Sequence, residues 1–340
     1  MLVPVNDLRL EDEVPLKTLP SEAHWSENYC FFGHDYESNC GLYVHIGRWA
    51  QDPTIWREQV YIYLPDGTSL SYRSLGQGDC SEGPRGALLR LRCLEAGQRW
   101  ECAYVGPTIH TSPRMLMDGP LRETILEKME LRIVFKALAP PLMYRIPDNS
   151  TIGRWHYEQE IALDGSVRFQ GREHSINGHG WRDHTRGPRH LPHLRGHVNT
   201  CGRLPDGTFF SCFVLWEEHD GVERQLVSEG RLINGGEFTP AEVLEVTRLN
   251  SLDQWQDDIR LTLQAQNRRI ELVGRPLNLV VISCNDRFEF VYGTAPEIAP
   301  LTTFIQPVRY RLGDQVVGGH SERSIWMTSS AERGDVNAAR

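Results

Sequence analysis

The feature that most constrains the fold of this chain is the alternation of apolar and polar residues in short runs, separated by turn residues. A period of two residues is typical of β-strands with one buried face. Pairs such as Asp-Gly, Ala-Gly and Asn-Arg at the turns indicate hairpins. The pattern recurs in VYIYLPDGTSLSYR (60–73), ALLRLRCLEAGQRWECAYV (87–105), IALDGSVRFQGREHSI (161–176), RLPDGTFFSCFVLW (203–216), DIRLTLQAQNRRIELV (258–273) and RFEFVYG (287–293). We therefore predict a nearly all-β protein.

Helical periodicity is scarce. The best candidate for a helix is PAEVLEVTRLN (240–250), and PLRETILEKMELRIVF (120–135) fits a helical turn followed by a strand. Many short strands at regular spacing favour a sandwich or a closed barrel. A barrel of about eight strands has room for side chains or for one small ligand.

The length of 340 residues favours two domains. The sequence LPDGT occurs at residues 64–68 and again at 204–208. This repeat fits two copies of one domain, but it also fits a turn sequence that is common in hairpins. The Pro-, Gly- and Arg-rich stretch TRGPRHLPHLRG (185–196) is typical of a linker. We expect domains at 1–190 and 191–330 and a flexible tail at 331–340.

Charge and cysteine content exclude some classes of protein. A net charge of −9 and a pI near 5.8 argue against nucleic acid as a partner, since phosphate backbones attract basic surfaces. The first residues lack the basic and apolar regions of a signal peptide, and no run of 18 apolar residues predicts a transmembrane segment. The eight cysteines form no C-x-x-C pair, so we expect reduced thiols and a cytoplasmic location.

The segment GHGWRDHTRG (178–187) is unusually rich in chemically active side chains. If it is a strand, His179, Trp181 and Asp183 share one face, and Arg182 and His184 share the other. If the first face lies inside a barrel, desolvation would raise the pKa of Asp183, so that it could protonate an alkene. Trp181 would stabilise the resulting cation, and His179 would tune or relay the proton.

A structural role for this segment is the alternative. Asp183 could instead pair with Arg182, Arg186 or Arg189, and Trp181 could belong to an ordinary core. Metal binding is a further alternative, because seven histidines fall within 42 residues, at 156, 174, 179, 184, 190, 193 and 197. Helical metal-ligand spacing is absent and Pro188 and Pro192 interrupt the run, so we expect no bound metal.

Two flanking segments contain further candidate site residues. They are HWSENYCFFGHD (24–35), with Trp25, Glu27 and Tyr29, and GGHSERSIW (318–326), with His320 and Glu322. Each could line a pocket or belong to an exposed strand. The sequence contains no G-x-S-x-G motif, P-loop or complete G-x-G-x-x-G fingerprint, so we expect no cofactor.

The stretch GHGWRDHTRGPR (178–189) resembles the G-x-G-x-R-D-H-x-x-G-x-R signature of the carotenoid 1,2-hydratase and AttH-like superfamily. Tocopherol cyclase, kievitone hydratase and lipocalin-like Diels–Alderases are distant relatives of that group. HWSENY and GGHSER are similar to another branch of it. The resemblance implies two tandem lipocalin-like β-barrels with few short helices, and a hydrophobic pocket at or near their junction. It also implies that Asp183 is the proton donor.

Two classes of function follow from the residues and the resemblance together. The first is a cofactor-independent hydratase, dehydratase, isomerase or cyclase that acts on a hydrophobic, isoprenoid-like alkene. Its catalytic residues would be Asp183, His179 and Trp181, supported by Arg182, His184, Arg189, Trp25, Glu27, Tyr29, His320 and Glu322. The second is a non-catalytic intracellular carrier of a lipid or isoprenoid, because one fold can support either function. A metal-dependent hydrolase or oxygenase is a third class of function. The sequence is also compatible with a homodimer.

Overall fold

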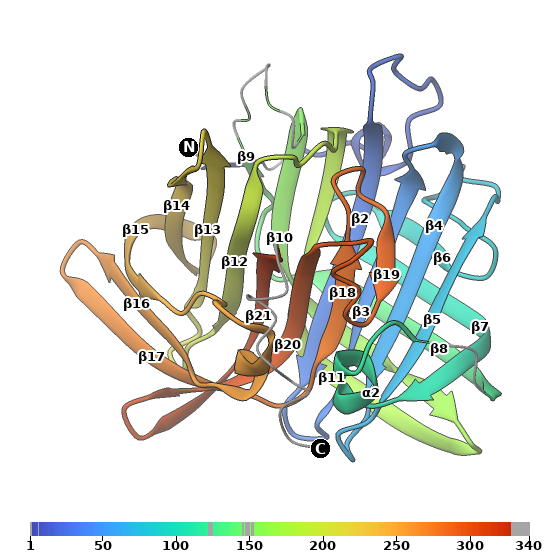
Figure 1. Cartoon of the computed structure of the whole chain (residues 1–340). Helices are drawn as coiled ribbons and strands as arrows, with labels where there is room; N and C mark the ends of the chain where they lie inside the picture. The colour runs from blue at the N-terminus through green and yellow to red at the C-terminus, as the bar shows by residue number, and fades with distance from the viewer. Residues whose placement is uncertain are drawn as a thin grey trace, which may run out of the picture. The chain divides into compact units, whose positions relative to one another are not determined.

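The computed structural model describes residues 2–5, 7–121, 125–144, 146, 150 and 153–327. The chain divides into two compact units (Figure 1). Met1–Thr111 and Glu123–His190 form the first unit, and Ser112–Arg122 and Leu191–Arg340 form the second. The predicted tail at 331–340 lies outside the described residues.

Eight antiparallel strands of the first unit close into a barrel. Their order is β10, β11, β2, β3, β4, β5, β7 and β8, and β8 pairs again with β10. The barrel strands are β2 (Trp25–Asp35), β3 (Cys40–Trp49), β4 (Asp52–Tyr63), β5 (Ser69–Gly76), β7 (Arg99–Thr111), β8 (Leu126–Ala137), β10 (Trp155–Phe169) and β11 (Arg172–Pro188). The unit also contains α1 (Leu10–Glu13), β1 (Leu2–Pro4), β6 (Arg90–Glu95) and β9 (Leu142–Tyr144).

The second unit contains another closed barrel of eight antiparallel strands. Their order is β12, β13, β14, β15, β16, β17, β20 and β21, and β21 pairs again with β12. These are β12 (Leu194–Arg203), β13 (Phe209–His219), β14 (Val222–Asn234), β15 (Glu237–Val246), β16 (Ile259–Ala265), β17 (Arg268–Pro276), β20 (Leu301–Leu312) and β21 (Gln315–Trp326). Also present are α2 (Pro113–Met117), the 3-10 helix η1 (Leu252–Gln256), β18 (Val280–Cys284) and β19 (Phe290–Tyr292).

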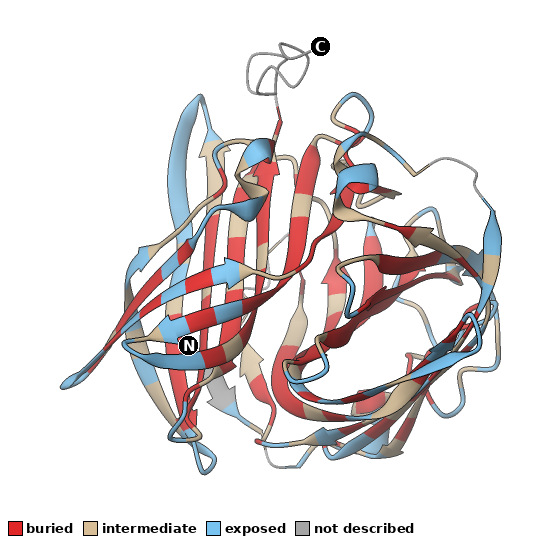
Figure 2. Ribbon diagram, turned by 90° about the horizontal axis from the view of Figure 1, so that it is seen from below, coloured by how far each residue is buried: buried red, intermediate tan, exposed pale blue. Residues whose placement is uncertain are grey.

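The predicted fold class is therefore confirmed: the protein is all-β, with two barrels and only short helices. Buried and exposed residues alternate along strands such as β8 and β17, as the sequence pattern indicates (Figure 2). The core of the first barrel includes Phe31, Val44, Ile62, Trp100 and Ile133, each at most 1% exposed. These inward side chains define which face of each strand is the inner face.

The prediction of a helix at 240–250 is wrong, because β15 covers residues 237–246. The register of β15 against β16 shifts between Val243 and Glu245. Ala241, Val243 and Val246 all pack against the core of the second barrel, so their spacing changes from two to three. An irregularity in a strand thus produced an apolar spacing that looks helical.

The stretch 120–135 and the LPDGT repeat are the other two sequence features that the structure places. In the ambiguous stretch 120–135, the strand half is β8, while residues 122–124 lie outside the described residues. The LPDGT repeat marks the turn between β4 and β5 and the turn between β12 and β13. These are the third and fourth strands along one barrel, and the first and second along the other. The repeat therefore reflects turn chemistry and does not mark equivalent positions.

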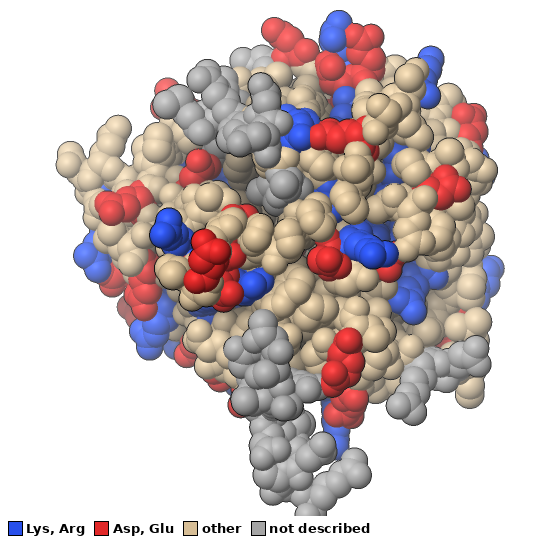
Figure 3. Space-filling model, turned by 45° about the horizontal axis from the view of Figure 1, so that its top comes forward, with Lys and Arg blue, Asp and Glu red and all other residues tan. Residues whose placement is uncertain are grey.

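All eight cysteines are free thiols. Within the described part of the chain, no helix is long and apolar enough to cross a membrane. On the face shown in Figure 3, acidic and basic side chains lie interspersed.

Candidate active site

Strand β11 contains most of the predicted site and presents two chemically distinct faces. Arg182 lies opposite Phe31 of β2, a core residue, so its side chain points into the barrel together with that of His184. Trp181 and Asp183 alternate with these residues and point outward. The two predicted sets therefore do occupy opposite faces, but the basic set is on the inner face. The hypothesis that Asp183 is an acid assumed that the face with His179, Trp181 and Asp183 lies inside the barrel. A period of two residues does not determine which face is inside.

The inner face holds a group of ionisable residues, which we call the inner ionic cluster: Glu13, Glu27, Arg182, His184 and Arg186. Arg182 donates two hydrogen bonds to the Glu13 carboxylate, at 3.0 and 2.9 Å. Tyr157 adds a third, at 2.7 Å, from its hydroxyl to Oε2 of Glu13. The Nε of Arg182 donates to Oε1 of Gln159 at 2.7 Å. Glu13 and Arg182 are both almost completely buried.

Glu27 is the second carboxylate of the inner ionic cluster. Its Oε1 lies 2.8 Å from Nε of Arg186 and 3.2 Å from Nε2 of His184, and its Oε2 lies 3.2 Å from Nε of Arg48. The ring of Tyr29 stacks on His184, with centroids 3.8 Å apart. The predicted residues Glu27, Tyr29 and His184 thus meet inside the barrel.

Protonation in the inner ionic cluster follows from burial and pairing. Burial opposes ionisation of Glu13, but the charge and hydrogen bonds of Arg182 outweigh it and lower the pKa of Glu13 to about 2. For Glu27, burial is outweighed by the hydrogen bond from His184 and the charge of Arg186, and the pKa is again about 2. Burial lowers the pKa of His184 to about 4. Near neutral pH the carboxylates are therefore ionised and the imidazole is neutral, so this cluster is not a proton donor.

The outer face of β11 presents a different arrangement. Asp183 lies directly opposite Glu158 of β10 and opposite Cys30 of β2. We call Asp183 and Glu158 the outer acidic pair, since directly opposed residues have Cβ atoms about 5 Å apart. Glu158 is 3% exposed and accepts hydrogen bonds from the Tyr144 hydroxyl at 2.8 Å and from Nε2 of His156 at 3.4 Å. Asp183 is half-buried.

The two arginines nearest to Asp183 in sequence form ion pairs on the inner face. Arg182 pairs with Glu13 and Arg186 with Glu27, both inside the barrel. Arg189 follows β11 and donates its backbone N–H to the carbonyl of His24 at 2.9 Å.

The other members of the predicted catalytic set lie further along the outer face. Trp181 is 1% exposed and lies opposite Glu160 and Phe32. His179 is exposed and lies four residues from Asp183, about 13 Å along the strand. At that separation, a direct proton exchange between His179 and Asp183 is not possible.

The remaining predicted residues are distributed over both units. Trp25, at the start of β2, is 5% exposed and lies opposite Pro188. His320 and Glu322 lie on β21 of the second unit, where Oε1 of Glu322 is 2.7 Å from Nε2 of His197. Nδ1 of that histidine is 2.6 Å from the Ser324 hydroxyl.

Sequence reasoning missed the partners that define both faces: Glu13, Tyr157, Glu158 and Gln159. Tyr157, Glu158 and Gln159 could have been found from the hairpin between β10 and β11. This hairpin turns at Gln170 and Gly171, which both have positive φ. Counting outward from this turn places Glu158 opposite Asp183. Glu13 gave no local signal, because it is 169 residues from Arg182.

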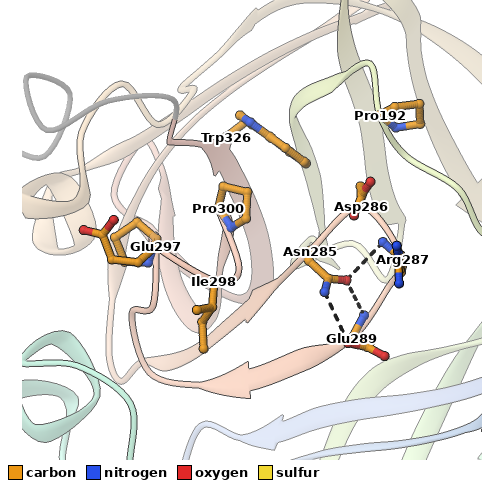
Figure 4. A pocket seen from close by; sticks show the side chains of 10 residues that line it. Pro192, Asn285, Asp286, Arg287, Glu289, Glu297, Ile298, Pro300 and Trp326 are labelled. Atoms are coloured by element: carbon orange, nitrogen blue, oxygen red, sulfur yellow. Dashed lines mark hydrogen bonds between the residues drawn. The ribbon is translucent and has the colours of Figure 1, made fainter.

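The described residues contain no group of three or more His, Cys, Asp or Glu side chains placed to hold a metal ion. The second unit contains an open pocket of about 490 Å³ beside the turn between β18 and β19 (Figure 4). Trp326, Ile298 and Pro300 form an apolar wall, and Asn285 accepts hydrogen bonds from the backbone of Arg287 and Glu289. No residue of the predicted site lines this pocket.

Residues 9–296 match the model of a family described as "Domain of unknown function (DUF7064)". Comparison with the curated protein sequences gave no match.

Three solved structures are similar over most of the chain. A candidate AttH from Nitrosomonas europaea has a TM-score of 0.55 at 14% identity, covering 92% of this chain and 98% of its own. CghA has a TM-score of 0.52 at 11% identity, covering 96% and 98%. Kievitone hydratase from Nectria haematococca has a TM-score of 0.50 at 10% identity, covering 89% of each chain. The predicted resemblance to the AttH-like superfamily is thus confirmed at the level of the fold.

Proposed function

Because the chain belongs to the DUF7064 family and has the fold of a known hydratase, we propose that it is a cofactor-independent enzyme that protonates an alkene in a hydrophobic substrate. The reaction is hydration or its reverse, isomerisation or cyclisation of an isoprenoid-like compound. The observation that supports this proposal is the outer acidic pair, in which a half-buried carboxyl group lies beside a fully buried one.

Two carboxyl groups at this spacing cannot both ionise freely, so the pair tends to retain one proton. Glu158 accepts hydrogen bonds from Tyr144 and His156, and these bonds favour its ionised form. In this proposal, Asp183 is the member of the pair that carries the shared proton. A carboxylic acid kept neutral by its surroundings is the form that general acid catalysis requires.

The proposed step transfers the Asp183 proton to an alkene carbon and leaves a carbocation. Trp181 is two residues away on the same face, about 7 Å along the strand, and its π electrons stabilise the cation. Attack by water completes a hydration, loss of a neighbouring proton completes an isomerisation, and attack by a second alkene closes a ring. The proton released by water, or lost from the cation, restores Asp183. We assign His179 a role in contacting the substrate further along the same face.

The test uses deuterium, because protonation in D₂O places deuterium on carbon. We would incubate the protein with geraniol, farnesol and geranylgeraniol in D₂O and measure incorporation by mass spectrometry. The wild-type protein should label at least one of these alkenes. Asp183→Asn should reduce labelling about 100-fold or more, the usual contribution of a general acid. Labelling of every active alkene at the wild-type rate by Asp183→Asn would refute the proposal.

Glu158→Gln is the companion variant. Without the negative charge beside it, Asp183 holds its proton less strongly, so the labelling rate should decline at lower pH than in the wild-type protein. Glu127→Gln, which changes a half-buried carboxylate on β8, is the matched control and should leave the pH profile unchanged. Circular dichroism and thermal melting would verify that all three variants are folded.

A further inference from the structure

The two barrels have the same strand order around the ring, so their strands can be matched. β11 corresponds to β21, β10 to β20 and β2 to β12. In each barrel, an arginine of the last strand donates a hydrogen bond to a glutamine of the strand before it. Arg182 donates to Gln159 at 2.7 Å, and Arg323 donates to Gln306 at 2.9 Å. Both arginines are essentially fully buried and point into their own barrel.

The two arginines differ in how their charge is compensated. In the first barrel, the Glu13 carboxylate from the N-terminal segment accepts two hydrogen bonds from Arg182. In the second barrel, none of the described carboxylates forms an ion pair with Arg323. Its Nε and Nη1 are buried and have no acceptor among the described residues. Asp257 acts on Arg323 only at longer range, from an exposed position.

A second buried polar group lies beside Arg323. Ser321 is two residues earlier on the same face of β21, directly opposite Gln306. It is 0% exposed, and its hydroxyl also has no partner within the described structure. Burial lowers the pKa of Arg323 to about 10, which leaves the guanidinium charged at neutral pH. Such donors are normally satisfied by an acceptor, and a guanidinium is best satisfied by a carboxylate.

The surroundings of Arg323 and Ser321 indicate the chemistry of the rest of the ligand. The core of the second barrel is built from apolar side chains, which include Phe210, Leu232, Ile259, Leu261, Leu263 and Val308. The Gln306 side chain, which accepts the hydrogen bond of Arg323, donates to the backbone carbonyl of Trp255 at 2.7 Å. The helix η1 therefore lies close to Arg323. An eight-stranded barrel can enclose one small ligand.

We propose that the second barrel binds an apolar monocarboxylic acid, with the carboxylate on Arg323 and Ser321 and the hydrocarbon part among the apolar side chains. The ligand carboxylate accepts hydrogen bonds from Arg323, as the Glu13 carboxylate does from Arg182. This site lies in a different unit from Asp183, and its existence does not depend on the proposed reaction.

The test compares octanoate with octan-1-ol, which has the same chain length and no charge. Isothermal titration calorimetry at pH 7.5 should show that the wild-type protein binds octanoate at least about tenfold more tightly than octan-1-ol, since charge-assisted hydrogen bonds favour the acid. Equal affinity for acid and alcohol, or no binding of octanoate, would overturn the proposal.

Arg323→Leu and Arg182→Leu form a matched pair of variants. Arg323→Leu removes an uncompensated buried charge, so it should fold with an unchanged or higher Tm and lose the preference for octanoate. Arg182→Leu leaves Glu13 buried without its partner, so its Tm should fall. Retention of the octanoate preference by Arg323→Leu would contradict the proposal. A Tm of Arg323→Leu as low as that of Arg182→Leu, or its failure to fold, would assign Arg323 a purely structural role.

Discussion

At the scale of single residues, the same few side-chain types have different roles on the two faces of β11. The carboxylates of Glu13 and Glu27 are buried and surrounded by arginines, so they are ionised and hold the N-terminal segment in the first barrel. Asp183, on the outer face, lies opposite Glu158, and its proposed role is that of an acid. A neighbouring charge decides whether a buried carboxyl group is a structural anion or an acid.

The inner ionic cluster predicts how stability depends on pH. The pKa values of Glu13 and Glu27 are lowered from 4.5 to about 2, so their contribution is complete above pH 4.5 and is lost as the pH falls towards 2. Each contributes on the order of 3 kcal/mol. His184, lowered from 6.5 to about 4, acts in the same direction, because below pH 6.5 the unfolded chain takes up a proton that the folded protein does not. Stability should therefore begin to fall below about pH 6.5.

Urea unfolding of the first unit, measured from pH 7.5 to pH 3, would check this dependence. Glu13→Gln should be less stable at pH 7 by about 3–5 kcal/mol, since it breaks a buried pair, and its stability should decline less steeply below pH 4.5. Glu37→Gln, at an exposed carboxylate of the first unit, serves as the control. A free energy of unfolding that stays constant between pH 7 and pH 3.5 would contradict the assignment.

At the scale of elements, β11 depends on glycine where it approaches β2. A Cβ atom on Gly180 would lie 1.9 Å from the Phe32 carbonyl oxygen, and one on Gly178 would lie 2.3 Å from the His34 carbonyl oxygen. Both contacts involve backbone atoms, which cannot rotate away. The glycines of the motif therefore allow two backbones to lie close together, and this close pairing sets the positions of Arg182 and Asp183.

Gly180→Ala should accordingly destabilise the first unit by about 1–3 kcal/mol, as overpacking does in a closely packed region. Ser175→Ala, at an exposed position on the same strand, should change stability by less than about 0.5 kcal/mol. The free energy of unfolding in urea measures both effects. If the two variants were equally stable, close backbone packing would not be the reason for glycine at position 180.

At the scale of the whole molecule, each unit has its own closed barrel and its own apolar core. The first barrel also depends on the N-terminal segment, because Glu13 neutralises Arg182 and the carbonyls of Val14 and Leu16 accept hydrogen bonds from Arg186 and Arg48. This dependence is local to the first unit.

Deletion of residues 1–16 should therefore affect the two units unequally. Arg182 and Tyr157 would lose the buried carboxylate between them, so hydrogen exchange in β2, β10 and β11 should become faster by at least about 100-fold. Exchange in β12, β13 and β21 should stay within a few-fold of the full-length chain. Equal acceleration in both sets of strands would show that the segment stabilises the molecule as a whole.

The sequence by itself determined the all-β class and the division of the β11 side chains into two sets, because both follow from a local period of two residues. Only the tertiary structure decided that Arg182 and His184 face inward, since either face of a strand can be buried. It also decided that Glu13 neutralises Arg182 and that Glu158 stands beside Asp183. Ring closure and hairpin register bring together residues that no local pattern connects, and the chemistry of both faces depends on those partners.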